Sequence, residues 1–122
     1  MPVTVLLARY DGPDAPQALD ERELELDALP EVGDVLWLNQ PYAVRRVGDE
    51  APARVEAELD AERWLRLMAR LPLEYTLNVF RPAGLGAFDA VVGNVEGGVR
   101  GYGRHATDGQ QAAEAALRDA RL

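Results

Sequence analysis

Clusters of glycine, proline, aspartate and asparagine interrupt this chain often enough to limit it to short elements in its first half. Such clusters occur at residues 11–14, 29–34 and 39–41. Residues of these types form tight turns, and a turn ends any regular element that precedes it. The first half of the chain is therefore predicted to be a series of short strands joined by turns.

The segments between these turns have strand composition. Residues 3–9 are aliphatic and β-branched, and residues 23–28 alternate acids with leucine or alanine, which places carboxylates on one solvated face. Residues 35–38 and 42–47 flank a turn and are expected to pair as a hairpin. An antiparallel β unit is therefore predicted over residues 1–50.

A helix is predicted to begin near Pro52 and to end at Leu71. Proline suits a first helical turn because its missing N–H would be unpaired there anyway. Apolar residues then recur at helical spacing, with acids early and arginines late, as the helix dipole favours. Trp64 is expected to anchor this helix in the core, and other aromatic residues on apolar stripes are also predicted to be core: Trp37, Tyr42, Tyr75 and Phe80.

Three strands and a second helix are predicted after this point. Residues 75–80, 88–95 and 99–105 have strand composition, and the loop at 81–86 and the turn at 96–98 are short enough for a meander. A helix over residues 109–122 follows, with Thr107 or Asp108 as its N-cap and with alanines that allow close packing on a sheet. Together the patterns predict an α+β fold in one compact domain. It consists of an antiparallel β unit (1–50) followed by a unit of helix, three-stranded antiparallel meander and C-terminal helix (51–122).

The second of these units resembles a known family. The sequences LPLEYTLNVF, FDAVVGNVEGGVRGYGRHA and QQAAEAALRDA occur in that order, with Gly101 and Gly103 on the third strand. This order resembles the α-β-β-β-α fold of double-stranded-RNA-binding domains over about residues 55–122. The strand and helix pattern around Gly103, Thr107 and the alanines at 112–116 is also similar to small HicB-like antitoxins. The resemblance implies this fold and makes nucleic-acid binding by the second unit a possible function.

Charge argues against general nucleic-acid binding. The chain holds 13 arginines and 21 acids, so its net charge is -8, which repels phosphate. Residues 1–74 hold 8 arginines and 16 acids, whereas residues 75–122 hold 5 of each. The neutral second part is therefore where nucleic acid would bind, and the acidic first part would meet a basic partner or exclude nucleic acid.

Four cations of the second part are the candidate nucleic-acid contacts: Arg81, Arg100, Arg104 and His105. Duplex-RNA binders of the resembled family place lysines at the start of the last helix, where residues 107–110 are Thr, Asp, Gly and Gln. The predicted first helix is acidic. We therefore expect no strong nucleic-acid binding, and no appreciable binding of duplex RNA at physiological salt.

The chain lacks the residue types that several kinds of catalytic chemistry require. The chain has no Cys, Lys or Ser, which excludes thiolate and serine nucleophiles, Schiff-base lysines and zinc-thiolate sites. His105 is the single histidine, and the acids at 20–27 lie on a solvated strand face without converging on a cation. Glycines at 97–103 lack the lysine and helix of a phosphate loop, and we predict that they are turn and close-packing glycines. We predict no catalytic, cofactor or metal site, and a protein that is not an enzyme.

The function predicted from these observations is a non-catalytic protein-interaction or regulatory module with a protein partner. The alternative is binding of structured RNA or DNA through the second unit. Open strand edges also predict a homo-oligomer. No apolar run reaches the roughly 20 residues of a membrane span, and the N-terminus lacks the pattern of a signal peptide, so we expect a cytoplasmic protein that does not contact membranes.

Overall fold

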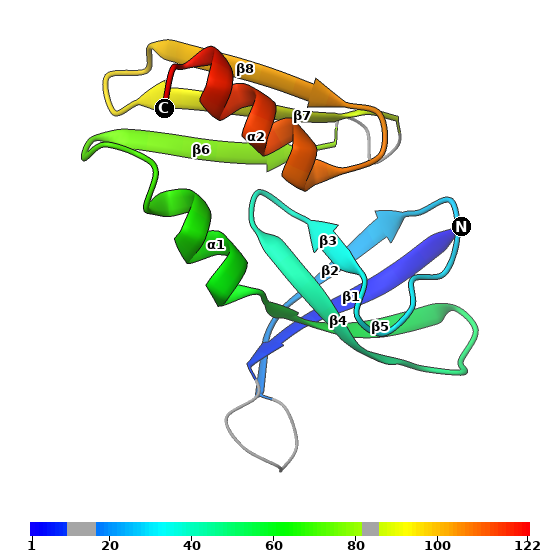
Figure 1. Ribbon diagram of the computed structural model, residues 1–122. Helices are drawn as coiled ribbons and strands as arrows, with labels where there is room; N and C mark the ends of the chain where they lie inside the picture. Colours follow the sequence, from blue (N-terminus) through cyan, green and yellow to red (C-terminus); the bar gives the residue numbers. More distant parts are fainter. Residues whose placement is uncertain (10–16, 82–85) are drawn as a thin grey trace. The chain divides into compact units, whose positions relative to one another are not determined.

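A computed structural model describes residues 1–9, 17–81 and 86–122 (Figure 1). The turn predicted at 11–14 and most of the loop predicted at 81–86 lie outside these residues. The described chain is β-rich, with eight strands in two sheets and two helices. The predicted α+β fold is therefore wrong, because strands occupy much of the segment assigned to the first helix.

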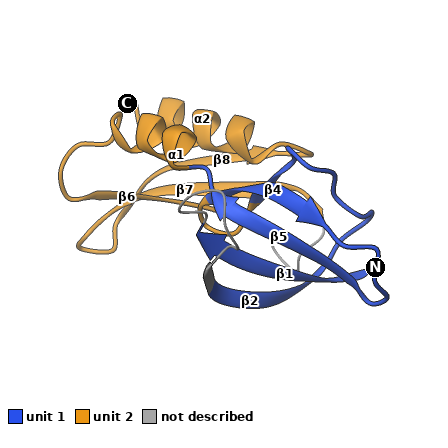
Figure 2. Cartoon of the chain, turned by 90° about the horizontal axis from the view of Figure 1, so that it is seen from below, with its two compact units in different colours: residues 1–36, 41–60 blue, residues 37–40, 61–122 orange. Residues whose placement is uncertain are grey.

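The chain divides into two compact units (Figure 2). Unit 1 contains residues 1–36 and 41–60, and unit 2 contains residues 37–40 and 61–122. Unit 1 is built on a five-stranded sheet in the order β2-β1-β5-β4-β3. Its strands are β1 (Pro2–Arg9), β2 (Gln17–Glu25), β3 (Val35–Trp37), β4 (Pro41–Val47) and β5 (Ala53–Leu59).

The prediction of a purely antiparallel sheet is wrong, because this sheet is mixed. β1 pairs antiparallel with β2 and parallel with β5, and β4 pairs antiparallel with β5. The residues of its core are small, β-branched or aliphatic, as expected for a sheet face that is removed from water. They are Val3, Val5, Leu7, Val44, Val55 and Ala57.

The strand β5 replaces the predicted start of the helix. Its residues alternate between buried and more accessible positions. Val55 and Ala57 lie in the core, and Arg54 is exposed. β5 lies between β1 and β4, so its backbone groups pair on both sides. The small apolar residues and acids of this segment fit both the helical repeat of 3.6 residues and the strand repeat of two. Pairing with two neighbouring strands favours the strand over the helix.

Unit 2 is a three-stranded antiparallel sheet, in the order β6-β7-β8, with two helices. Its strands are β6 (Tyr75–Phe80), β7 (Phe88–Asn94) and β8 (Val99–His105), and its helices are α1 (Ala61–Met68) and α2 (Gly109–Asp119). The strand ranges confirm the sequence prediction to within one residue, and α2 ends three residues earlier than predicted. Within the described chain, neither helix has the length and apolar composition needed to cross a membrane.

The buried residue of the short helix α1 is Leu67, whereas Trp64, the predicted anchor, is only half-buried. Leu67 is fully buried, Trp64 is half-buried, and Leu65 is exposed. Trp37 is the buried tryptophan, as predicted, and its indole lies against the first residue of α2. A Cβ built on Gly109 would come within 2.3 Å of that ring, so only glycine fits there.

Glycines in β8 allow α2 to lie directly on the sheet. A Cβ on Gly103 would lie 2.3 Å from the carbonyl oxygen of Ala112, and one on Gly101 would lie 2.4 Å from that of Ala116. Real Cβ contacts are never this short, so both positions require glycine while the helix keeps its place. The predicted close-packing role of these glycines is confirmed, and the alanine face of α2 is fully buried.

Candidate functional site

The sheet of unit 2 has one face under α2 and one face that neither described helix covers. Leu77, Val79, Ala90 and Val92 are buried on the α2 side. Paired residues of antiparallel strands share a face, so the registers place the intervening residues on the other side. We call this second side the open sheet face; its rows are Phe80, Asp89 and Arg104, then Asn78, Val91 and Tyr102, then Thr76, Gly93 and Val99.

Large apolar and aromatic side chains are uncovered on the open sheet face. Phe80 is 37% exposed, Tyr102 is 46% exposed and Val99 is 68% exposed. Phe80 was predicted to be core, and the structure contradicts this because its strand position points it away from α2. Exposed aromatic and apolar side chains on one face of a rigid sheet are a feature of interaction surfaces.

A buried carboxylate lies on the central strand of this face, in its end row. Asp89 is 7% exposed, and its Oδ1 accepts a hydrogen bond of 2.5 Å from the hydroxyl of Tyr102. The Nε of Arg104 lies 3.4 Å from the same oxygen. The hydrogen bond to Asp89, and secondarily burial, raise the pKa of Tyr102 above its usual range. Asp89 therefore holds the tyrosine ring in place in its protonated form.

Three of the four predicted nucleic-acid contacts, Arg81, Arg104 and His105, lie at the end of the sheet where β6 and β8 end, whereas Arg100 lies near the start of β8. Arg100 and Arg104 are exposed on β8, and Arg104 belongs to the open sheet face. Arg100 lies where the pairing of β7 and β8 shifts register. Arg81 donates to the carbonyl of Gly86 at 2.9 Å, and its guanidinium carbon lies 5.2 Å from the centre of the Phe88 ring.

His105 has a local structural contact at the start of α2. Its Nδ1 accepts hydrogen bonds from the backbone N–H groups of Thr107 at 3.2 Å and Asp108 at 3.0 Å. Of the two predicted N-caps, Thr107 and Asp108, the structure has Asp108. Its side chain accepts a hydrogen bond from the N–H of Gln110 at 2.8 Å. Histidine and aspartate thus satisfy backbone donors near this helix end.

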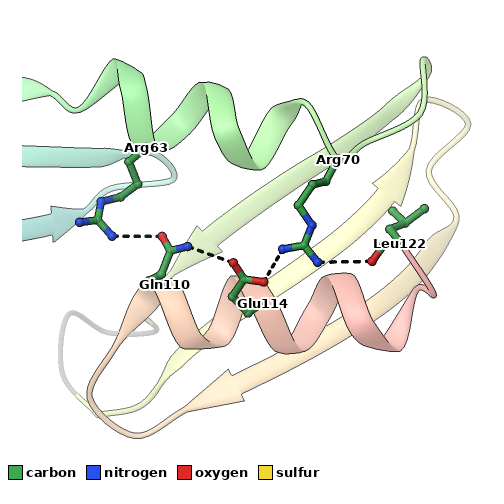
Figure 3. Close-up of polar contacts among 5 residues, drawn as sticks. All are labelled: Arg63, Arg70, Gln110, Glu114 and Leu122. Carbon is green, nitrogen blue, oxygen red and sulfur yellow. Dashed lines mark hydrogen bonds and ion pairs between the residues drawn. The ribbon is translucent and has the colours of Figure 1, made fainter.

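The helices α1 and α2 are joined by a chain of polar contacts (Figure 3). Arg63 donates to the side-chain oxygen of Gln110 at 3.2 Å, and Gln110 donates to Glu114 at 3.2 Å. Arg70 forms an ion pair with Glu114 and donates to the carbonyl of Leu122 at 3.3 Å. Each donor here meets an acceptor within unit 2, so this network supports helix packing.

The acids near β2 are exposed and do not converge. Asp20, Glu21, Glu23, Glu25 and Asp27 are all exposed, in agreement with the predicted solvated face. Within the described ranges, no group of three or more His, Asp or Glu side chains is placed to hold a metal ion. The hydrogen bond from the N–H of Glu21, and then Arg22, lower the pKa of Asp20.

Sequence patterns missed the residues that make the open sheet face. Alternation alone indicates two faces for β6 and β8, but it does not tell which face a helix covers. The sequence of β8 does indicate which face is covered, because glycines alternate there with Arg100, Tyr102 and Arg104. The helix α2 packs on the glycine side, so the larger side chains lie on the uncovered side.

Comparison of the chain with protein-family models, with curated proteins and with solved structures found no match. The resemblance to double-stranded-RNA-binding domains and HicB-like antitoxins therefore stays a prediction.

Proposed function

We propose that this chain is a non-catalytic, cytoplasmic protein-interaction module that binds a protein partner through the open sheet face. The observation that carries the proposal is the exposure of Phe80, Val99 and Tyr102 on one face of a rigid sheet. Soluble proteins rarely leave large contiguous apolar patches uncovered unless a partner binds there. Aromatic residues and arginine are also the types enriched in protein interfaces.

The hydrogen bond between Tyr102 and Asp89 supports this role. It restricts the tyrosine ring before any partner binds, so less side-chain entropy is lost on association. The neighbouring Arg104 supplies a charged group beside this aromatic side chain. Ordered tyrosine and arginine side chains of this kind often contribute most of the binding energy of an interface.

Nucleic-acid binding is the second candidate function, and one observation favours it. Proteins that bind single strands also stack bases on aromatic side chains of a sheet and contact phosphates with arginine. Phosphate binding depends on the number of cations, and here Arg104 lies beside Asp89, which reduces its net charge effect. Unit 1 also holds 14 acids against 5 arginines, whereas unit 2 holds 7 against 8.

The interaction is tested by comparing two double variants as bait. Phe80→Ala/Tyr102→Ala removes aromatic area from the open sheet face, and Leu65→Ala/Leu73→Ala removes exposed leucines from elsewhere in unit 2. Proteins retained from nuclease-treated extract are identified, purified and titrated against each variant. We expect a partner whose affinity falls at least about tenfold with the aromatic variant and is unchanged with the leucine variant. Equal affinity for both variants would contradict the proposal.

Nucleic acid is tested separately with duplex RNA and single-stranded DNA at about 50 and 200 mM salt. The comparison variant is Arg100→Ala/Arg104→Ala. We expect no micromolar binding at the higher salt. Micromolar or tighter binding that this variant loses would replace the protein-interaction function with the nucleic-acid one.

A further inference from the structure

The ends of four strands meet at one end of the unit 1 sheet. β1 and β5 run parallel, so their last residues, Arg9 and Leu59, lie toward the same end. β2 and β4 run antiparallel to these strands, and therefore begin at that end. Tyr42, near the start of β4, pairs with Leu59.

A groove of about 370 Å³ lies at this end and is lined by residues of all four strands. Leu7 and Ala8 form a buried part of its lining, and Leu59 and Tyr42 add apolar and aromatic surface. The volume falls in the range of small-molecule sites, which are typically apolar with a few polar groups.

A β-bulge places a leucine at this groove. Leu7 pairs with Asp20 and Ala8 pairs with Ala18, so Leu19 is an extra residue on β2 without a partner on β1. Leu19 is 60% exposed and lines the groove. Bulges redirect side chains and often occur beside functional sites. Beside the bulge, two successive residues of β1, Leu7 and Ala8, are both buried.

Among the described residues that line the groove, both acids have ion-pair partners and one cation has none. Glu58 forms an ion pair with Arg45 at 2.9 Å, and Asp20 forms one with Arg22 at 3.2 Å. Asp20 also accepts from the N–H of Glu21 at 2.8 Å. In the part of the chain that the structure describes, Arg9 has no ion pair. Among the described residues, the lining therefore offers one guanidinium that has no ion pair, beside acids that already have partners.

We propose that this groove binds a small organic monocarboxylate with an apolar or aromatic body. The carboxylate pairs with Arg9, whose planar guanidinium suits two parallel hydrogen bonds. Arg22 keeps N–H groups beyond the Nε that contacts Asp20, and these are further donors. The apolar body contacts Leu19, Leu59 and Tyr42. The site lies within unit 1 and does not depend on the open sheet face.

Three probes of the same shape test the charge of the ligand. Phenylbutyrate, phenylbutanamide and phenylbutylamine are titrated separately into the full chain at constant salt, with backbone amide chemical shifts followed by NMR. We expect phenylbutyrate to shift amides at the groove with a Kd of about 1 mM or tighter. It should bind about tenfold more tightly than the amide, because one charge-assisted contact is lost in the amide. The amine should bind more weakly than both.

Two variants and a control locate the site. Arg9→Gln should weaken phenylbutyrate binding about tenfold and leave phenylbutanamide binding unchanged. Arg46→Gln changes the same charge in unit 1 at an exposed position outside the groove lining, and should change neither. Leu19→Ala should weaken both probes by a similar factor of about three, because it removes apolar contact only.

Three results would overturn the proposal. The first is tighter binding of the amine than of the carboxylate, which would make Asp20 and Glu58 the recognition groups. The second is an equal effect of Arg9→Gln and Arg46→Gln on phenylbutyrate affinity. The third is the absence of groove shifts up to about 10 mM phenylbutyrate, a concentration well above the expected Kd.

Discussion

Asp89 shows how a single residue sets the properties of its surroundings. It is the one buried charged side chain among the described residues, and a buried carboxylate is costly unless hydrogen bonds and opposite charge compensate it. Tyr102 and Arg104 provide this compensation from the neighbouring strand. The same contacts hold the exposed tyrosine ring in one orientation on the open sheet face.

The titration of Tyr102 should report this contact. Its raised pKa means that the folded state favours the protonated tyrosine, so the stability from this group is present below about pH 10, the usual value in unfolded chains. That stability is lost as the pH rises through the folded pKa. In absorbance titrations of tyrosinate, with Tyr102→Phe identifying the signal, Asp89→Asn should lower the pKa of Tyr102. Glu96→Gln, in the turn after β7, should not. Ionisation of Tyr102 at or below pH 10 in the unaltered protein would contradict the expectation.

At the scale of elements, the contact between α2 and β8 depends on the absence of side chains. Gly101 and Gly103 bring strand backbone against helix backbone, and the alanines of α2 complete the close approach. Asp119 adds a contact at the other end of α2, since its carboxylate accepts from the N–H of Tyr102 at 2.9 Å. The helix therefore packs on one face of β8 and also satisfies a backbone donor of this edge strand.

Replacing Gly103 by alanine should separate α2 from the sheet. The new Cβ would meet the backbone of Ala112, which cannot move without shifting the helix, so we expect a loss of about 1 to 3 kcal/mol in the free energy of unfolding. Val99→Ala in the same strand, at an exposed position, should change it by about 0.5 kcal/mol or less. Urea unfolding measures both. If the space at Gly103 were open, alanine would instead stabilise the strand, and that result would exclude the close contact.

At the scale of the whole molecule, uncovered strand edges favour self-association and acidic charge opposes it. Unit 1 carries the whole acidic excess, and β2 is a long edge strand that pairs only with β1 in the described sheet. In unit 2, the carboxylate of Asp119 accepts from the N–H of Tyr102 on the β8 edge. The backbone N–H of Asn39 donates to the carbonyl oxygen of Val79 on the β6 edge. An uncovered edge strand can pair with another chain, but acids along it repel a second copy.

We therefore expect the predicted homo-oligomer to form more readily as salt increases. Screening at about 500 mM salt shortens the range of repulsion between acidic edges compared with about 50 mM. Light scattering at high protein concentration should give a mass above the 13.4 kDa of one chain, with a larger oligomeric fraction at the higher salt. A mass of one chain at both salt concentrations would contradict the prediction.

Local sequence alone determined the elements whose signals are contained in a few residues. Strands β6, β7 and β8 follow from β-branched and aromatic runs between turns, and α2 follows from a capping residue before an alanine-rich stretch. The packing role of Gly101 and Gly103 was predictable because small residues faced each other in both elements. The absence of cysteine, lysine and serine likewise follows from composition, whatever the fold.

Tertiary structure decided what depends on partners distant in the chain. The segment at 53–59 is a strand because β1, about fifty residues earlier in sequence, pairs with it in parallel, and no local pattern contains that contact. Phe80 is exposed because α2 covers the other face of its strand, and strand pairing places Arg81 and His105 at the same end of the sheet as Arg104 and away from Arg100. Periodicity shows that a strand has two faces, but only the packing of other elements determines which face meets solvent.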